Sequence, residues 1–136
     1  MANQYRNAEL LTALWKLGAE GSRLPTSHGI LDRALFHVRD QLPASFRDTL
    51  TFSKTGVGLR CLELPAILLA AQEAMLTSEP NPTYLSTFVT MDEDSARQIV
   101  LDFDLTTSAA RQIGDRLRKT VDEIRGEIGN LQVVTA

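Results

Sequence analysis

The pattern of apolar and polar positions is most uneven between Leu64 and Leu76, where only Gln72 and Glu73 are polar from residue 66 onward. A helix whose apolar surface runs nearly all the way round has to be covered on most sides. Pro65 suits the first helical position, because an N–H there would have no partner within the helix. The run is too short to cross a bilayer, which takes about 20 apolar residues. We therefore predict a buried central helix over 64–76.

Upstream of this helix, the periodicity predicts three further helices and a hairpin. Apolar residues recur every three or four positions in the first two helices, and Asn7 and Thr26 or Ser27 are available as their N-caps. Two β-compatible runs flank the glycine-containing loop 54–58 and predict a β-hairpin. The expected elements are helices over 8–18, 27–41 and 44–50 and strands over 50–53 and 59–64.

Downstream, the segment 77–83 contains two prolines and is expected to break the regular structure. Aromatic and β-branched residues follow, which favour a strand. The motif Thr90-Met-Asp-Glu93 fits a capping box at a helix start. The last helix is expected to end at Gly129-Asn130, and residues 131–136 to form a loose tail. The expected elements are a strand over 84–90 and helices over 92–103 and 107–128.

Together these elements predict an α+β fold that is mainly α, with five or six helices, a small antiparallel hairpin or three-stranded sheet, and a long C-terminal helix. The chain has 136 residues, of which 43% are apolar and 23% charged, enough for a single domain over 1–136 with its own core. Residues 8–78 and 84–130 are expected as its N-terminal and C-terminal parts. The sequence contains no signal-peptide-like or transmembrane run, which predicts a cytoplasmic protein without a membrane partner.

The chemically versatile residues do not match a catalytic motif. His28, His37 and the single Cys61 are too few for a zinc site, which usually needs four ligands. Ser27 lies next to His28 in sequence, but capping of a helix explains this segment. The loop 54–58 combines a lysine with glycines and lacks the GxxxxGK[ST] order of a phosphate-binding loop. We therefore predict that the protein is not an enzyme and uses no cofactor or metal.

Charge is divided unevenly along the chain. The formal net charge is −3, yet residues 1–64 carry eight Lys+Arg against six Asp+Glu, whereas residues 65–136 carry six against eleven. A polyanionic partner, if the protein has one, is therefore expected at the first half of the chain. The alternative interpretation is a solvated surface of mixed charge.

The order helix, helix, short helix, hairpin, helix in residues 8–78 resembles that of winged-helix transcription regulators. The likeness rests on the leucine-rich first helix followed by Gly21…His28-Gly29-Ile30, and on a hairpin that looks like a wing, with Lys54 at its tip and Arg60 on its return strand. It covers about half of the chain and implies a DNA-binding domain. The chain departs from the family at the recognition helix, since 43–50 is short and 106–118 is a second candidate for that role.

These observations lead to two functional hypotheses. The first is a small cytoplasmic regulator that binds double-stranded DNA as a homodimer. The alternative is a non-enzymatic protein-interaction or scaffolding module with no nucleic-acid binding. For DNA, phosphate contacts are expected from Arg33, Arg39, Arg47, Lys54 and Arg60. The dimer is expected through an apolar stripe of the last helix that is spaced like a coiled-coil seam: Ile113, Leu117, Val121, Ile124 and Ile128. The same stripe could instead pack within one chain.

Overall fold

A computed structural model describes residues 3–18, 23–26, 29–56, 58–78 and 86–135, with side chains for all of these except Asn3, Ser86 and residues 127–135. The expected class, α+β and mainly α with a long C-terminal helix, is confirmed. The helices are α1 (Asn3–Gly18), α2 (Ile30–Val38), α3 (Ala44–Arg47), α4 (Leu64–Glu73), α5 (Glu93–Asp102) and α6 (Thr107–Thr135), with a 3-10 turn η1 (Arg39–Gln41) after α2. The strands are β1 (Leu24–Pro25), β2 (Phe52–Thr55), β3 (Gly58–Cys61) and β4 (Ser86–Thr87).

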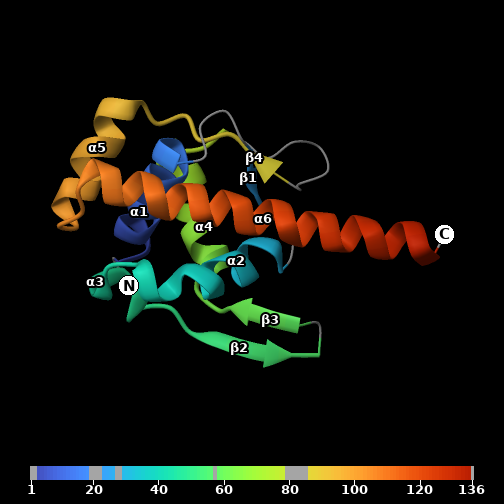
Figure 1. Ribbon diagram of the computed structural model, residues 1–136. Helices are drawn as coiled ribbons and strands as arrows, with labels where there is room; N and C mark the ends of the chain where they lie inside the picture. Colours follow the sequence, from blue (N-terminus) through green and yellow to red (C-terminus); the bar gives the residue numbers. More distant parts are fainter. Residues whose placement is uncertain (1–2, 19–22, 27–28, 57, 79–85, 136) are drawn as a thin grey trace.

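Helix α1 lies at the centre of the molecule and packs against α4, α5 and α6 (Figure 1). Its side chains are buried on nearly every side, and Leu10, Leu14 and Trp15 are at most 1% exposed. One apolar cluster joins residues from all six described helices. The core is therefore continuous and is organised around α1.

The expectation that residues 64–76 form the buried central helix is wrong. In α4, Leu64, Ile67 and Ala71 are buried, whereas Pro65 and Leu69 are exposed. The apolar run in this segment thus covers two faces, one that packs on the core and one that faces solvent. Hydrophobicity by itself does not say whether a face is covered, because much of any protein's surface is apolar.

Helices α1 and α6 cross in backbone contact at two glycines. A Cβ atom placed on Gly114 would lie less than 3.0 Å from the carbonyl oxygen of Leu14, and one on Gly18 would lie less than 3.0 Å from the amide nitrogen of Asp115. Real Cβ atoms essentially never approach other atoms this closely. Any side chain at either glycine would therefore push the two helices apart.

The predicted hairpin is confirmed, since β2 and β3 pair in antiparallel register from Phe52 opposite Cys61 to Thr55 opposite Gly58. The strand predicted over 84–90 is much shorter. Its described part is β4, which pairs with β1, and an isolated bridge joins Thr77 to Val89. The described strands form two separate two-stranded sheets instead of one three-stranded sheet.

The start of α5 differs from the predicted capping box. The cap is Asp92, whose carboxylate accepts a hydrogen bond of 2.7 Å from the amide of Ser95. Thr90 instead donates its hydroxyl to the carbonyl oxygen of Met75, 2.9 Å away. Thr90 therefore joins two segments that are distant in sequence, and the local sequence pattern could not predict this contact.

The ends of other helices also differ from the predicted ones. Asn7 lies inside α1, and its amide donates to the hydroxyl of Thr49 at 3.0 Å, so it is not an N-cap. The second helix stops at Val38 and continues as η1, while the third is a single turn, α3. Helix α6 passes the predicted stop at Gly129-Asn130 and continues to Thr135. The predicted cap Ser27 lies outside the described residues.

Four residues of the predicted dimer stripe are buried within the chain itself: Ile113, Leu117, Val121 and Ile124 are 5% exposed or less. Helix α6 packs against α1 and α2 there. The side chain of the fifth residue, Ile128, lies outside the described ones. Figure 1 shows the C-terminal end of α6 extending beyond the other elements. Packing within one chain, which the sequence left open, accounts for this stripe as far as Ile124.

We predict that Gly114→Ala destabilises the protein, although alanine is the better helix former. The added methyl group would meet the backbone of α1, and overpacking of this kind costs about 3 kcal/mol. Gly126→Ala is the matched control, because its Cβ would meet nothing within 4 Å. That change should raise the free energy of unfolding by up to about 1 kcal/mol. Urea denaturation of both variants measures the difference, and equal stability would show that the helices do not need this contact.

Candidate functional site

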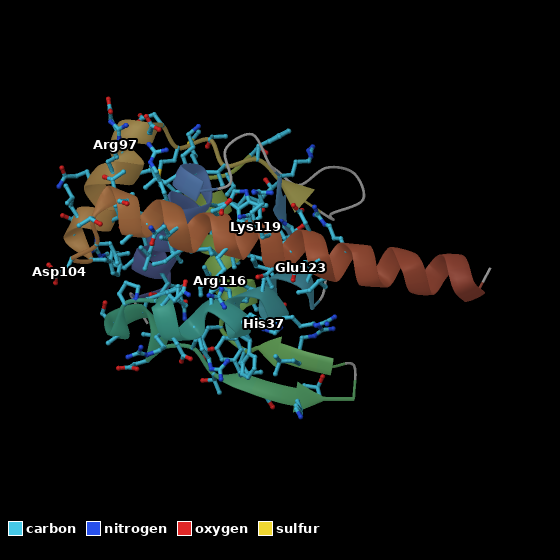
Figure 2. The ribbon with its side chains drawn as sticks, viewed as in Figure 1. His37, Arg97, Asp104, Arg116, Lys119 and Glu123 are labelled. Atoms are coloured by element: carbon cyan, nitrogen blue, oxygen red, sulfur yellow. The ribbon has the colours of Figure 1, made fainter. Side chains whose placement is uncertain are left out.

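A pocket of about 440 Å³ lies between α2, the hairpin and α6. Arg33 and His37 of α2 and Arg60 of β3 line it, together with Ile124 of α6, and no acidic residue belongs to its described lining. Figure 2 shows His37 in the space between the hairpin and α6. The remaining lining residues are Gly29, Ile30, Phe36, Gly58 and Leu59. We call this the basic pocket.

The sequence of α2 explains how two basic side chains reach the pocket. Residues 30, 33 and 37 are three and four positions apart and therefore share one face of the helix. The other face, with Leu31, Leu35 and Val38, is buried in the core. The amphipathic pattern thus turns the basic face of α2 toward the hairpin.

Arg60 reaches the same pocket from β3. Its guanidinium lies over Gly29, where a Cβ atom would come within 3.0 Å of the Nη1 atom. Gly29 has a φ of 86°, a left-handed conformation that glycine adopts at little cost. The side chain of Arg60 forms no hydrogen bond or ion pair with any residue that the structure describes. Within that part of the chain, no carboxylate lies within ion-pair distance of this guanidinium.

Two contacts hold the hairpin against α2. The carboxylate of Asp32, only 6% exposed, accepts a hydrogen bond of 2.7 Å from the backbone amide of Cys61. The rings of Phe36 and Phe52 meet edge to face, with centroids 5.3 Å apart. Sequence reasoning missed Asp32. A signal was present, because an acidic residue next to Leu31 in an otherwise apolar stripe needs a polar partner once it is buried.

The other predicted phosphate ligands do not line the basic pocket. Arg39 stacks over the ring of Phe36, 3.7 Å from its centroid. Arg47 lies on α3 and pairs with Asp48 at 3.6 Å. Lys54 is exposed and lies opposite Leu59 in the hairpin register, so the alternation of the strands points it away from the face of Arg60. The structure thus brings together Arg33 and Arg60, and it adds His37.

Cys61 is not suited to nucleophilic chemistry. Burial raises the pKa of its thiol to about 12, and the carboxylate of Glu63, 3.9 Å from the sulfur, also disfavours the thiolate. The reactive form of cysteine is the thiolate, so this thiol stays inert at neutral pH.

The arrangement is suited to binding an anion. Arg33, His37 and Arg60 line one pocket, and guanidinium groups bind phosphate and carboxylate oxygens through paired hydrogen bonds. In the described part of the chain, no group of three or more His, Cys, Asp or Glu residues is placed to hold a metal ion. No described helix is long and apolar enough to span a membrane. Comparisons with known protein families, with curated proteins and with solved structures found no match to this chain.

We predict that Cys61 reacts slowly with a thiol reagent in the folded protein. At pH 8, labelling with iodoacetamide should be at least about 100-fold slower than in urea, where the pKa returns to about 8.5. Mass spectrometry of timed samples measures both rates. Comparable rates in the two conditions would mean that β3 does not hold this thiol in the core.

Proposed function

We propose that this protein is a small regulator that binds double-stranded DNA through α2 and the β2–β3 hairpin. The observation that carries the proposal is the basic pocket, where Arg33, His37 and Arg60 converge from two elements. Phosphate is the anion that DNA presents along its whole length, and arginine binds it with two parallel hydrogen bonds. The net negative charge of the chain does not oppose such binding, because local clusters set the potential that a charged ligand meets.

The proposed contacts are mainly to phosphate. The short helix α3 has four residues, which is less than a helix needs to read bases along the major groove. Arg39 and Arg47 are engaged by Phe36 and Asp48 of their own chain. The proposed ligands are Arg33 and Arg60, which line the basic pocket, and Lys54, which is exposed on the other face of the hairpin. Contacts of this kind position a protein on DNA without reading its sequence, so the binding depends strongly on salt and weakly on sequence.

In this proposal, the dimer forms through the C-terminal end of α6. Val121, Ile124, Ile128 and Leu131 are spaced by three, four and three positions, as in a coiled-coil seam. Within the described side chains, Ile124 is the last buried residue of this series. The part of α6 beyond it extends past the body of the molecule (Figure 1). A second copy would cover it through a twofold axis.

The alternative function, a protein-interaction module that does not bind nucleic acid, is favoured by a different observation. Apolar side chains are exposed along and beside α4, with Leu62 and Leu69 each 56% exposed and Met75 82% exposed. Exposed apolar patches often mark interaction surfaces. Titration with DNA at low salt separates the two functions, because this alternative predicts no duplex binding.

We predict that the parent protein binds a random 20-base-pair duplex at low salt. Combining Lys54→Gln with Arg60→Gln should weaken binding and reduce the slope of log K against log salt by about 0.9 for each phosphate that is no longer neutralised. Arg97→Gln is the matched control, because Arg97 lies on α5, away from the hairpin (Figure 2), and pairs with Glu93. Fluorescence anisotropy at several salt concentrations measures the slopes. A parent protein that binds no duplex at low salt refutes the proposal.

We also predict that the protein is a homodimer at tens of micromolar, as measured by sedimentation velocity. Ile128→Ser together with Leu131→Ser should shift it toward the monomer without unfolding it, since every apolar residue of the described core is kept. Val133→Ser is the matched control, because it falls off the apolar seam. A monomeric parent protein would contradict the dimer and leave the DNA-binding proposal intact.

A further inference from the structure

A second pocket, of about 320 Å³, adjoins the basic pocket at Arg60. It lies between β1, α2, β3 and α4, and most of its lining is apolar. The polar lining residues are Thr26, Asp32 and Arg60. The apolar ones are Pro25, Leu31, Cys61, Leu62, Leu64, Pro65 and Leu68. Small-molecule sites are typically of this size and character, with a few polar groups in an apolar wall. We call it the apolar pocket.

The described lining of the apolar pocket holds one carboxylate and one guanidinium, and they differ in whether they already have a partner. The carboxylate of Asp32 already accepts the Cys61 amide, and the raised pKa of the Cys61 thiol keeps it neutral. Arg60 is the single cation of the described lining, and its guanidinium has no partner among the described residues. Arg60 is half-buried, and a ligand carboxylate placed beside it would be stabilised by paired, charge-assisted hydrogen bonds.

The apolar part of the lining indicates the rest of the ligand. Leu62 is 56% exposed at this pocket, which leaves apolar surface for a ligand to cover. A neighbouring pocket of about 260 Å³ shares Pro65 and Leu68 with it and continues along α4. An unbranched chain that starts at Arg60 could therefore run along this helix.

The geometry points to a small carboxylic acid with an unbranched apolar chain as the ligand of the apolar pocket. Its carboxylate pairs with Arg60, and its chain lies between Leu62 and Leu68. Arg60 lines both pockets, so an acid bound here withdraws a guanidinium from the basic pocket. Two ligands that compete for one group each weaken the binding of the other by the same factor. Only this coupling rests on the proposed DNA binding; the acid site does not.

The site is tested without DNA, by calorimetric titration of the full chain with sodium octanoate. We expect saturable binding that tightens about fourfold for each CH₂ group added from hexanoate to decanoate, as burial of apolar surface requires. Octan-1-ol and octylamine, which lack the carboxylate, should bind at least about tenfold more weakly. Shifts of the Leu62 and Leu68 methyl signals in NMR spectra would place the chain along α4.

Two variants separate the role of Arg60 from a general effect of charge. Arg60→Gln should weaken octanoate binding at least about tenfold and leave the weak binding of octan-1-ol unchanged. Lys54→Gln, which removes the same charge from the other face of the hairpin, should leave octanoate binding unchanged. Absence of saturable octanoate binding overturns the inference. Tighter binding of octylamine, which would identify Asp32 as the partner, or octanoate binding unaltered by Arg60→Gln, overturns it equally.

The coupling is tested by repeating the duplex titration at saturating octanoate. We expect weaker DNA binding by the parent protein and no effect of octanoate on DNA binding by Arg60→Gln. An unchanged DNA affinity of the parent protein overturns the coupling. If the parent protein binds octanoate but no duplex, the acid site stands and the proposed DNA binding fails, so the two failures are distinguishable.

Discussion

The contact between Gly18 and Gly114 is the constraint on which the rest of the structure depends. Two helices usually lie 8–10 Å apart because side chains separate them. Here a Cβ atom on either glycine would overlap the opposite backbone, so α1 and α6 approach more closely than any other residue pair would allow. This approach lets the 29-residue α6 lie directly across the central helix. The apolar stripe of α6, from Ala110 to Ile124, is then covered by the chain itself.

The position of α6 also shapes the basic pocket. Ile124 lines the space between α2 and the hairpin, and α6 packs against both α1 and α2. The hairpin is fixed in turn by a buried hydrogen bond from Cys61 to Asp32 and by the contact of Phe36 with Phe52. A two-stranded hairpin is marginally stable alone, so these contacts hold Arg60 in place. The pocket is thus a consequence of core packing on three elements.

Sequence reasoning predicted the hairpin, and it named Arg33 and Arg60 among five expected phosphate ligands without showing which of the five lie together. It could not show that Arg39 and Arg47 are engaged by Phe36 and Asp48. It also could not show that His37 joins the site. The sequence does not show whether the guanidinium of an arginine contacts another side chain in the folded protein. Such a contact depends on which side chains lie within a few ångströms, and folding decides it.

The mainly helical class, the hairpin and the apolar stripes could be predicted from the sequence, because each depends on residues only a few positions apart. Long-range packing places α1 and not α4 at the centre, pairs β1 with β4 and makes Asp92 and not Thr90 the cap of α5. The sequence shows that an apolar stripe must be buried, but it does not show which element packs against it. Several partners can satisfy the same apolar face. Which partner packs on the stripe depends on the fit between distant segments. Here two glycines separated by nearly 100 residues allow the first and last helices to pack together.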